Sequence, residues 1–409
     1  MLPIRLFVVE SLDLAQTLIM KFILILVSIF LPFINHAQET CFSEDLILFN
    51  QEVATNFSAN YPDCTVILGD VVLQGNVNFL GMEQLVEIQG TIRCGGDGEC
   101  NGIHDDFLGL ENVTSIGGIS LEEHVFSFDG LTSLEGITGS LLLDECTIAD
   151  FSALANLIEI GVDFRMTETN FASFNGMQNL ASVGQDFKVS ENALLLTSLY
   201  LESLVSVGGS FELSECDVID GFVGFVGLTS IGGDFIIDDC PLVTSLDGFA
   251  NIPSIAGVLK IRWNENLVDI SGIANFDPAS ISMVEIMSNP LLSMCAVTSV
   301  CGYLLSDGGS LIEMNSEGCT SAEVIIEQCV TSVFSDGNSE STFRLVNTLV
   351  ASELRMINPL NSTYSVLDGL GRTVLSSSAN PLFIGHLSPG LYFVQVDYDG
   401  SVHKFVVQD

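Results

Sequence analysis

Apolar and polar positions follow one recurring line between residues 71 and 289, where about ten copies can be aligned. In each copy two apolar residues flank one outward position, which is typical of a short strand with one buried face. From Ile119 onward, successive copies begin 22, 23, 23, 24, 24, 24 and 25 residues apart. Such a regular period predicts stacked coils. The first apolar positions of the copies are Val71, Ile92, Ile119, Leu141, Phe164, Phe187, Phe211, Phe235, Leu259 and Val284.

A second apolar row precedes the strands, and glycine or alanine directly follows most of its members. Glycine permits a sharp corner at these points. The exceptions are Ile88 and Ile137, after which Gly90 and Gly139 come one position later. One coil cannot bury its own apolar face, whereas a stack of coils can. The row consists of Ile88, Ile116, Ile137, Ile160, Val183, Val207, Ile231 and Ile255.

A third row lies five residues after the first apolar position of the copies. Its side chains are small or polar, and they suit a tight inward bend in which they bond to the backbone groups of the turn. The row consists of Asn76, His124, Cys146, Thr169, Asn192, Cys216, Cys240, Asn264 and Asn289.

These rows together resemble a known repeat, most clearly in the copy that runs from Ser230 to Leu242. The copies are similar to the leucine-rich-repeat line L-x-L-x-x-(N/C)-x-L. Their Ile-Gly corners and terminal cysteines resemble the receptor L domain more closely, over residues 41 to about 330. The resemblance implies a mainly β chain folded as a right-handed parallel β-solenoid of about ten coils, with cysteine-rich helical caps. It does not imply an enzyme.

Residues 1–37 have the layout of a signal peptide. Lys21 precedes an apolar run from Phe22 to Phe33, and Ala37 supplies a small residue for cleavage. Met20 is an alternative start, which would make the preceding residues an extended leader. The apolar run is short for a membrane anchor, so removal of this segment is the preferred interpretation.

Segments at both ends of the repeat are predicted to cap it, because an open coil end exposes apolar core. Residues 38–70 form the predicted N-terminal cap, in which Phe49, Val53 and Phe57 recur at four-residue spacing. This spacing predicts a short amphipathic helix.

Residues 290–330 form the predicted C-terminal cap. A helix is expected from Ala296 to Leu305, and Thr320 and Glu323 stand at capping-box spacing before a second helix. Residues 331–341 are rich in Ser, Gly and Asp, which predicts a linker.

The chain has eleven cysteines, an odd number. Cys216 and Cys240 of the inward row lie on adjacent coils, near enough to touch, and Cys146 is expected to be a buried thiol outside any disulfide. Four cysteines of the C-terminal cap allow three pairings, between which the sequence does not choose. Paired cysteines indicate an oxidising compartment. The disulfide candidates are Cys41 with Cys64 in the N-terminal cap, Cys94 with Cys100 in a small closed loop, and Cys295, Cys301, Cys319 and Cys329 in the C-terminal cap.

An insertion between the second and third copies carries Asp97, Glu99, Asp105 and Asp106. These carboxylates are the oxygen ligands that calcium prefers, but their spacing matches no EF-hand loop, so a solvated acidic loop is the preferred interpretation. His104 beside two of them suggests a general base. No nucleophile is spaced to use it, so a surface role is preferred.

Residues 342–409 alternate apolar and polar residues in short runs, which predicts a small immunoglobulin-like antiparallel β-sandwich. Three of its segments resemble the C-terminal sorting domain of the Bacteroidetes type IX secretion system, although the usual initial Pro-Asn-Pro is replaced near Asn347. The resemblance implies contact with the type IX machinery, export across the outer membrane, and a cell-surface or secreted location. An ordinary immunoglobulin-like binding domain is the alternative. The matching segments are Val366 to Arg372, Leu387 to Val394, and Lys404 to Val407.

The formal net charge is −41, which argues against nucleic acid as a partner. Residues 38–334 contain 43 Asp plus Glu but only five Lys plus Arg. All five basic residues are predicted to point outward on one strand face. They are Arg93, Arg165, Lys188, Lys260 and Arg262.

Two interpretations of this basic face remain open. In-register pairing with carboxylates accounts for three residues, namely Lys188 with Glu212, Lys260 with Glu285, and Arg262 with Asp238. It leaves Arg165 beside Lys188, and Arg93 without an acidic neighbour in its column. A recognition face for an anionic or polar ligand, made by Arg165, Lys188, Lys260 and Arg262, is the other interpretation. We place pairing ahead of recognition, because exposed ion pairs are common.

These features favour a secreted, cell-surface-attached binding or adhesion protein that recognises an extracellular protein or glycan. An extracellular polysaccharide-processing β-solenoid enzyme and a purely structural surface component are the alternatives. We recognise no catalytic nucleophile, base or metal set in the sequence.

Overall fold

The computed structural model describes residues 39–332, except positions 76, 95–105, 124, 149, 196–199 and 307. Nearer the C-terminus it describes 344–345, 349–350, 353–354, 356–357, 363–368, 372–377, 382–383, 387–388, 390–396 and 402–407. The predicted signal peptide and linker therefore lie outside the described residues, apart from the first two linker positions. No helix in the described part is long and apolar enough to cross a membrane.

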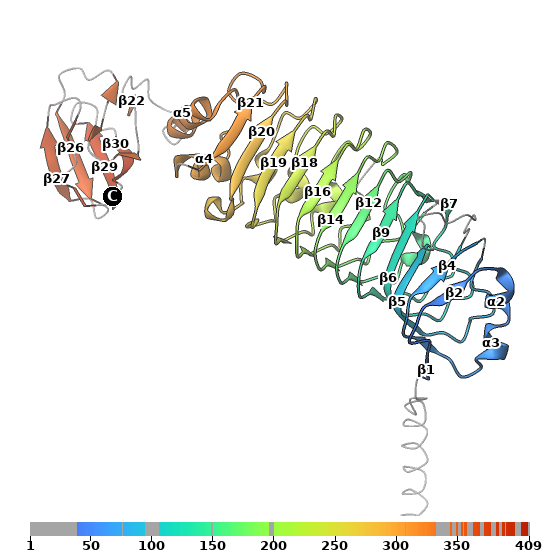
Figure 1. Cartoon of the computed structure of the whole chain (residues 1–409). Helices are drawn as coiled ribbons and strands as arrows, with labels where there is room; N and C mark the ends of the chain where they lie inside the picture. The colour runs from blue at the N-terminus through green and yellow to red at the C-terminus, as the bar shows by residue number, and fades with distance from the viewer. Residues whose placement is uncertain are drawn as a thin grey trace, which may run out of the picture.

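The described chain is mainly β, and most of its strands join one sheet of 19 parallel strands. Successive strands of the repeat lie side by side along the length of this sheet (Figure 1). The longer strands form what we call the main row. It consists of β2 (Leu46–Leu48), β4 (Val71–Leu73), β5 (Glu87–Cys94), β6 (Ser115–Glu122), β9 (Leu141–Asp144), β12 (Phe164–Thr167), β14 (Phe187–Ser190), β16 (Phe211–Ser214), β18 (Phe235–Asp238), β19 (Val258–Arg262), β20 (Met283–Met287) and β21 (Ser310–Glu313).

The predicted register of the main row is confirmed at every step. Each first apolar position pairs with the next, as Phe187 does with Phe211 and Phe211 with Phe235. The row also extends beyond residues 71–289. Leu46 of β2 pairs with Val71, and Val284 pairs with Ser310 of β21, so both predicted caps contribute a strand to the sheet.

Shorter strands form a parallel corner row, which β5 and β6 join to the main row. Its members pair as the second apolar row predicts, except at Ile255, which is buried but lies in no strand. The N–H of Thr229 donates to the carbonyl of Val205, and Pro253 occupies the next equivalent position without an N–H to donate. The row consists of β1 (Thr40–Cys41), β3 (Val66–Ile67), β8 (Gly136–Ile137), β11 (Glu159–Ile160), β13 (Ser182–Val183), β15 (Ser206–Val207) and β17 (Ser230–Ile231).

Short elements complete the repeats. A separate parallel pair consists of β7 (Val125–Phe126) and β10 (Thr147–Ile148). The 3₁₀ helices are η2 (Ser152–Leu154), η3 (Val223–Phe225), η4 (Asp247–Phe249), η5 (Ser271–Ile273) and η6 (Pro278–Ser280).

Ladders of stacked phenylalanines fill the core between the strands and the returning segments. Phe211 is fully buried and stacks on Phe187 and Phe235, with ring centroids 5.2 and 5.9 Å away. Phe225 and Phe249 meet the same ring edge-on at 4.9 and 5.3 Å. Each strand therefore contributes apolar contacts to both of its neighbours, as a repeat that buries its face only by stacking requires.

The corners bring backbone of adjacent repeats into direct contact. A Cβ on Gly208 would overlap the carbonyl oxygen of Gly184, and a Cβ on Gly232 would overlap that of Gly208. Glycine is therefore required by close approach of the chains, in addition to its tolerance of a sharp bend.

Replacing Gly208 with alanine is expected to lower the free energy of unfolding by about 1–3 kcal/mol, because the methyl group has no room beside the neighbouring backbone. Gly221→Ala is the matched control, since a Cβ there meets no atom within 4 Å. Chemical denaturation of both variants measures the difference. Equal stability of the two would show that the repeats do not approach each other this closely.

The N-terminal helical segment differs from its prediction. It consists of α2 (Gln51–Thr55) and α3 (Phe57–Asn60), with α2 beginning after Asn50, whose side chain accepts the Val53 N–H. Phe49 precedes the helix and is 60% exposed, so it is not part of a buried helical face. The predicted disulfide between Cys41 and Cys64 is present.

The C-terminal helices are α4 (Thr298–Leu305) and α5 (Ala322–Ser332). Helix α4 starts two residues later than predicted, because Val297 is still extended. At α5 the predicted capping box is wrong by one residue. The hydroxyl of Ser321, rather than that of Thr320, accepts the Val324 N–H.

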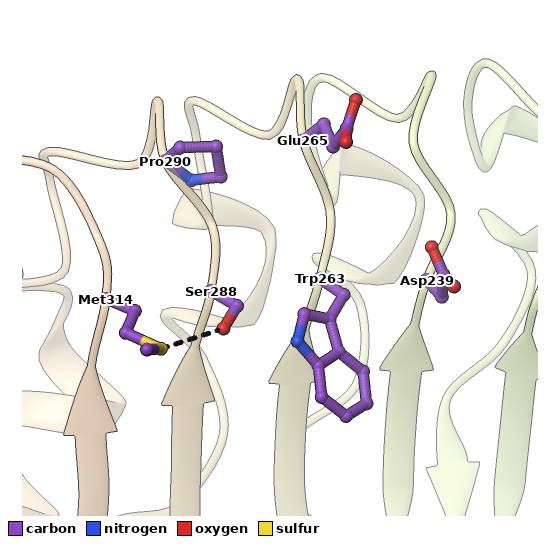
Figure 2. A pocket seen from close by; sticks show the side chains of 6 residues that line it. All are labelled: Asp239, Trp263, Glu265, Ser288, Pro290 and Met314. Carbon is purple, nitrogen blue, oxygen red and sulfur yellow. Dashed lines mark hydrogen bonds between the residues drawn. The ribbon is translucent and has the colours of Figure 1, made fainter.

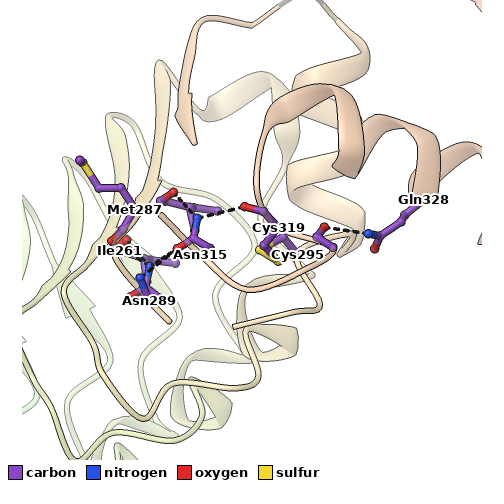
Figure 3. Close-up of a disulfide and its surroundings, with 9 residues drawn as sticks. Ile261, Met287, Asn289, Cys295, Asn315, Cys319 and Gln328 are labelled. Carbon is purple, nitrogen blue, oxygen red and sulfur yellow. Dashed lines mark hydrogen bonds between the residues drawn. A yellow bond between two sulfur atoms is a disulfide. The ribbon is translucent and has the colours of Figure 1, made fainter. Parts of the chain in front are cut away.

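The structure settles the pairing of the four C-terminal cysteines as Cys295–Cys319 and Cys301–Cys329. Figure 3 shows the first of these beside Asn315, whose amide donates to the carbonyl of Cys319 at 3.1 Å. The same amide donates to Ile286 O at 2.7 Å, which joins the disulfide to the main row. Cys94 is also disulfide-bonded, and its predicted partner Cys100 lies outside the described residues.

The strands after residue 343 form small sheets of their own. In the largest, the strand order is β23-β30-β29-β26-β27, and Tyr364, Val366 and Val394 are buried. Its pairs are antiparallel as predicted, except that β23 runs parallel to β30. The strands are β22 (Arg344–Leu345), β23 (Leu349–Val350), β24 (Glu353–Leu354), β25 (Met356–Ile357), β26 (Tyr364–Asp368), β27 (Thr373–Ser377), β28 (Leu382–Phe383), β29 (Gly390–Val396) and β30 (Val402–Val407).

Candidate functional site

All five basic residues between positions 39 and 332 form ion pairs. The predicted neighbours are confirmed, since Lys188 lies opposite Glu212 and Arg262 opposite Asp238. Lys260 lies opposite Glu285, but its Nζ approaches Asp238 instead. The pairs are Arg93 with Asp45 and Asp70 at 2.7 and 2.8 Å, Arg165 with Asp163 and Asp186 at 3.6 and 3.7 Å, Lys188 with Glu212 at 3.2 Å, Lys260 with Asp238 at 3.9 Å, and Arg262 with Asp238 and Glu285 at 2.6 and 3.9 Å.

Arg93 and Arg165 pair with carboxylates that do not lie directly opposite them on the neighbouring strands, so the in-register prediction did not include these pairs. Their partners are aspartates that directly precede strands of the main row, such as Asp70 before β4 and Asp186 before β14. A long arginine side chain reaches these diagonal positions. The like-charge register of Arg165 with Lys188 is present, but each of the two has its own carboxylate.

The tightest charged cluster lies at the end of β18 and β19. The Arg262 guanidinium donates to Asp238 Oδ2 through Nε and Nη2, at 3.2 and 2.6 Å. Its Cζ lies 4.6 Å from the ring centroid of Trp263, which is a cation–π contact. Asp238 thus holds Arg262, and Arg262 in turn supports the indole.

Directly after each main-row strand from β6 to β21, one non-glycine residue has a positive φ, between +50° and +58°. This conformation costs an L-residue about 1–2 kcal/mol. It turns the next side chain inward, where Asn289, for example, donates to Ile261 O and Met287 O at 3.0 and 3.1 Å. We call these positive-φ residues the turn row. They are Glu123, Glu145, Glu168, Glu191, Glu215, Asp239, Trp263, Ser288 and Met314.

The turn row is acidic over its first six members and changes character at the last three. There the row borders a pocket of about 650 Å³. Figure 2 shows Asp239, Trp263, Ser288 and Met314 in line, each at the end of its own strand. Glu265 and Pro290 complete the lining from the adjoining loops. Trp263 is 46% exposed and Met314 70% exposed, so aromatic and apolar surface is open to a ligand.

Three carboxylates of the turn row have a raised pKa, through repulsion at Glu145 and through partial burial followed by repulsion at Glu215 and Asp239. The carboxylates of Glu168 and Glu123 raise the pKa of Glu145. Partial burial, with repulsion from Glu191 second, raises the pKa of Glu215. Partial burial followed by repulsion from Asp238 raises the pKa of Asp239.

The melting temperature of the full chain is expected to rise as the pH falls from about 7 toward the ordinary glutamate pKa of 4.5, because a raised pKa means that the folded state binds the proton more tightly. Asp70 acts in the opposite sense, since hydrogen bonds from Thr91 N–H and then Arg93 lower its pKa. The stabilising contribution of Asp70 is lost only as the pH falls below 3.8, the ordinary pKa of this group.

Thermal melts of the full chain at a series of pH values measure the expected rise in melting temperature, and Glu145→Gln should reduce that rise. A melting temperature that falls between pH 7 and 5 would contradict it.

Buried thiols occupy part of the inward row. Cys146, Cys216 and Cys240 are buried thiols, as expected for Cys146. A hydrogen bond with Cys216, with burial second, raises the pKa of Cys240 well above its ordinary range. The Cys240 thiol is therefore a poor nucleophile, and the burial of all three side chains suits a structural role.

Among the described residues, no group of three or more His, Cys, Asp or Glu side chains is arranged to hold a metal ion. The calcium candidates Asp97, Glu99 and Asp105 lie outside the described residues, as does His104. No protein-family model matches the sequence, and a search of curated proteins finds no match.

Proposed function

We propose that the chain is an exported, cell-surface-attached binding protein. In this proposal the parallel sheet is part of a right-handed β-solenoid of the receptor L-domain kind, with one coil for each copy of the repeat. The unbroken register from Leu46 to Ser310 supports the solenoid, because strands about 24 residues apart pair repeatedly and in parallel. Disulfides at both ends of the register support caps that close it.

The C-terminal region in this proposal is an immunoglobulin-like sandwich that acts as a type IX sorting domain. Its supporting observations are the antiparallel pairing of β26, β29 and β30 and the matching sequence segments within them. Disulfide bonds are consistent with an oxidising compartment outside the cytoplasm. The partners of this region would be the type IX machinery.

The pocket beside Trp263 is the observation that most strongly supports a binding function. An exposed tryptophan supported by a paired arginine is a preorganised contact surface, and tryptophan is frequent at binding hot spots. The alternative surface around Arg165 and Lys188 remains a candidate, but ion pairs with Asp163, Asp186 and Glu212 already account for its charges.

The test is an array of extracellular proteins and glycans probed with the full chain and with Trp263→Ala. We expect the full chain to bind at least one ligand and the variant to lose at least about tenfold in affinity, as for a central aromatic residue. Arg165→Glu combined with Lys188→Glu should bind normally. If only that double variant loses affinity for the ligand, the binding site lies on the strand face and not at the pocket.

The two alternatives give different results. A purely structural component would bind no ligand on the array. A polysaccharide-processing enzyme would shorten anionic polysaccharides incubated with the full chain, which a binding protein leaves intact.

A further inference from the structure

The residues that line the Trp263 pocket indicate which class of ligand it binds. Of its six lining residues, Asp239 and Glu265 are carboxylates and none is basic. We infer that the pocket binds the side chain of a lysine or arginine presented by a basic segment of a partner protein. The inference rests on the proposed function, because it names the ligand class of the same binding protein.

Charge complementarity is the first argument. Residues 38–334 carry 43 acidic and five basic residues, and the five basic side chains pair with other carboxylates. Within the described residues, none of these ion pairs involves Asp239 or Glu265. Repulsion from Asp238, Asp217 and Glu265 adds to partial burial in raising the pKa of Asp239. A cationic side chain beside Asp239 would relieve this repulsion.

The indole ring of Trp263, which lines the pocket, also favours a cationic ligand. An indole attracts a cation over its face, and Arg262 already makes this contact at 4.6 Å. Arg262 is not among the lining residues, so it supports the ring from outside the pocket. Met314 and Pro290 add apolar lining, against which the alkyl stem of a lysine or arginine can pack.

Exposed apolar residues that lie close in sequence to the lining residues favour a protein over a free amine as the ligand. Leu242 and Leu291 occupy the same repeat position, two residues after the inward cysteine or asparagine, and are 45% and 50% exposed. Leu291 directly follows the lining residue Pro290, and exposed apolar side chains beside a polar site are typical of protein interaction sites.

The experiment is calorimetric titration of the full chain with three probes at low ionic strength. The first is a short Gly-rich peptide that contains arginine and lysine. The second is the same peptide with citrulline and acetyl-lysine, which keeps the shape and removes the charge. The third is a neutral chito-oligosaccharide. We expect the first to bind at least about tenfold more tightly than the second.

A matched pair of double variants separates the pocket from general attraction to an acidic protein. Asp239→Asn with Glu265→Gln should weaken the basic peptide about tenfold. Glu145→Gln with Glu168→Gln removes the same number of charges at turn-row positions outside the pocket and should change affinity less than about twofold. Asparagine is well tolerated at positive φ, so the fold at position 239 is retained.

Each other outcome overturns the inference. Equal weakening in the two double variants would show diffuse attraction without a pocket. Binding of the oligosaccharide in place of the basic peptide would make the pocket a carbohydrate site and leave the proposed binding function standing. If no probe binds, the lysine–arginine assignment fails, whereas the proposed function fails only if the array also shows no ligand.

Discussion

Phe211→Ala is expected to lower the free energy of unfolding by about 3–5 kcal/mol, which is the largest effect of any single substitution considered. The ring is fully buried and stacks between Phe187 and Phe235, while Phe225 and Phe249 cover its edges. Its removal leaves a cavity that the surrounding strands cannot close, because the strand spacing is fixed by backbone hydrogen bonds.

Phe49→Ala is the matched control for this measurement. It makes the same chemical change at a side chain that is 60% exposed, and it should alter stability by less than about 0.5 kcal/mol. Equilibrium denaturation of both variants gives the comparison. A loss below about 1 kcal/mol for Phe211→Ala would mean that the phenylalanine ladder is not tightly packed.

Replacing Cys301 and Cys329 together with serine is expected to cost about 2–5 kcal/mol. This disulfide joins α4 to α5 across a sequence separation of 28 residues, and it restricts the unfolded chain accordingly. Val300 and Leu304 of α4 and Ile325 of α5 belong to the buried apolar core, so loosening of these helices exposes part of that core.

Cys216→Ala provides the control, because Cys216 is a buried thiol without a disulfide. Its loss should cost about 1 kcal/mol, since the bonds that its Sγ donates to Val189 O and Ser214 O are long, at 3.9 and 3.4 Å. Mass analysis after alkylation of the unfolded, unreduced chain should find label on all three inward-row thiols. Protection of Cys146 would contradict the register.

The main-row register was predictable because two patterns constrain the same positions. Buried and exposed residues alternate along each strand, and equivalent strands recur roughly every 24 residues. A shift of one residue would turn Phe211 and Leu213 out of the core and Glu212 into it. The inward row was predictable for a related reason. Only a side chain that bonds to two backbone carbonyls, as Asn289 does, suits the bend after a strand.

Other features could not be predicted because they depend on contacts between distant segments. Strand β21 carries Ser310 at the first position instead of an apolar residue, which conceals it from the pattern. The pairing of Cys295 with Cys319 depends on how the chain returns beside α4. The carboxylates beside Arg93 lie just before neighbouring strands, with Asp45 directly before β2 and Asp70 directly before β4.

The pocket could not be predicted from the repeat pattern. Its residues come from several repeats and from positions on both sides of the inward row, such as Trp263 before Asn264 and Glu265 after it. One signal was nevertheless present. Trp263 is the single tryptophan of the chain, and it occupies a turn-row position at which the preceding repeats have an acidic residue.

The emission of that single tryptophan, recorded while a ligand from the array is added to saturation, tests the central claim most directly. Because Trp263 is the chain's only tryptophan, its emission reports on this pocket alone. A ligand that enters the pocket must change the polarity around the indole, so we predict a spectral shift or quenching that saturates together with binding. Binding that reaches saturation while the emission stays unchanged would contradict the account.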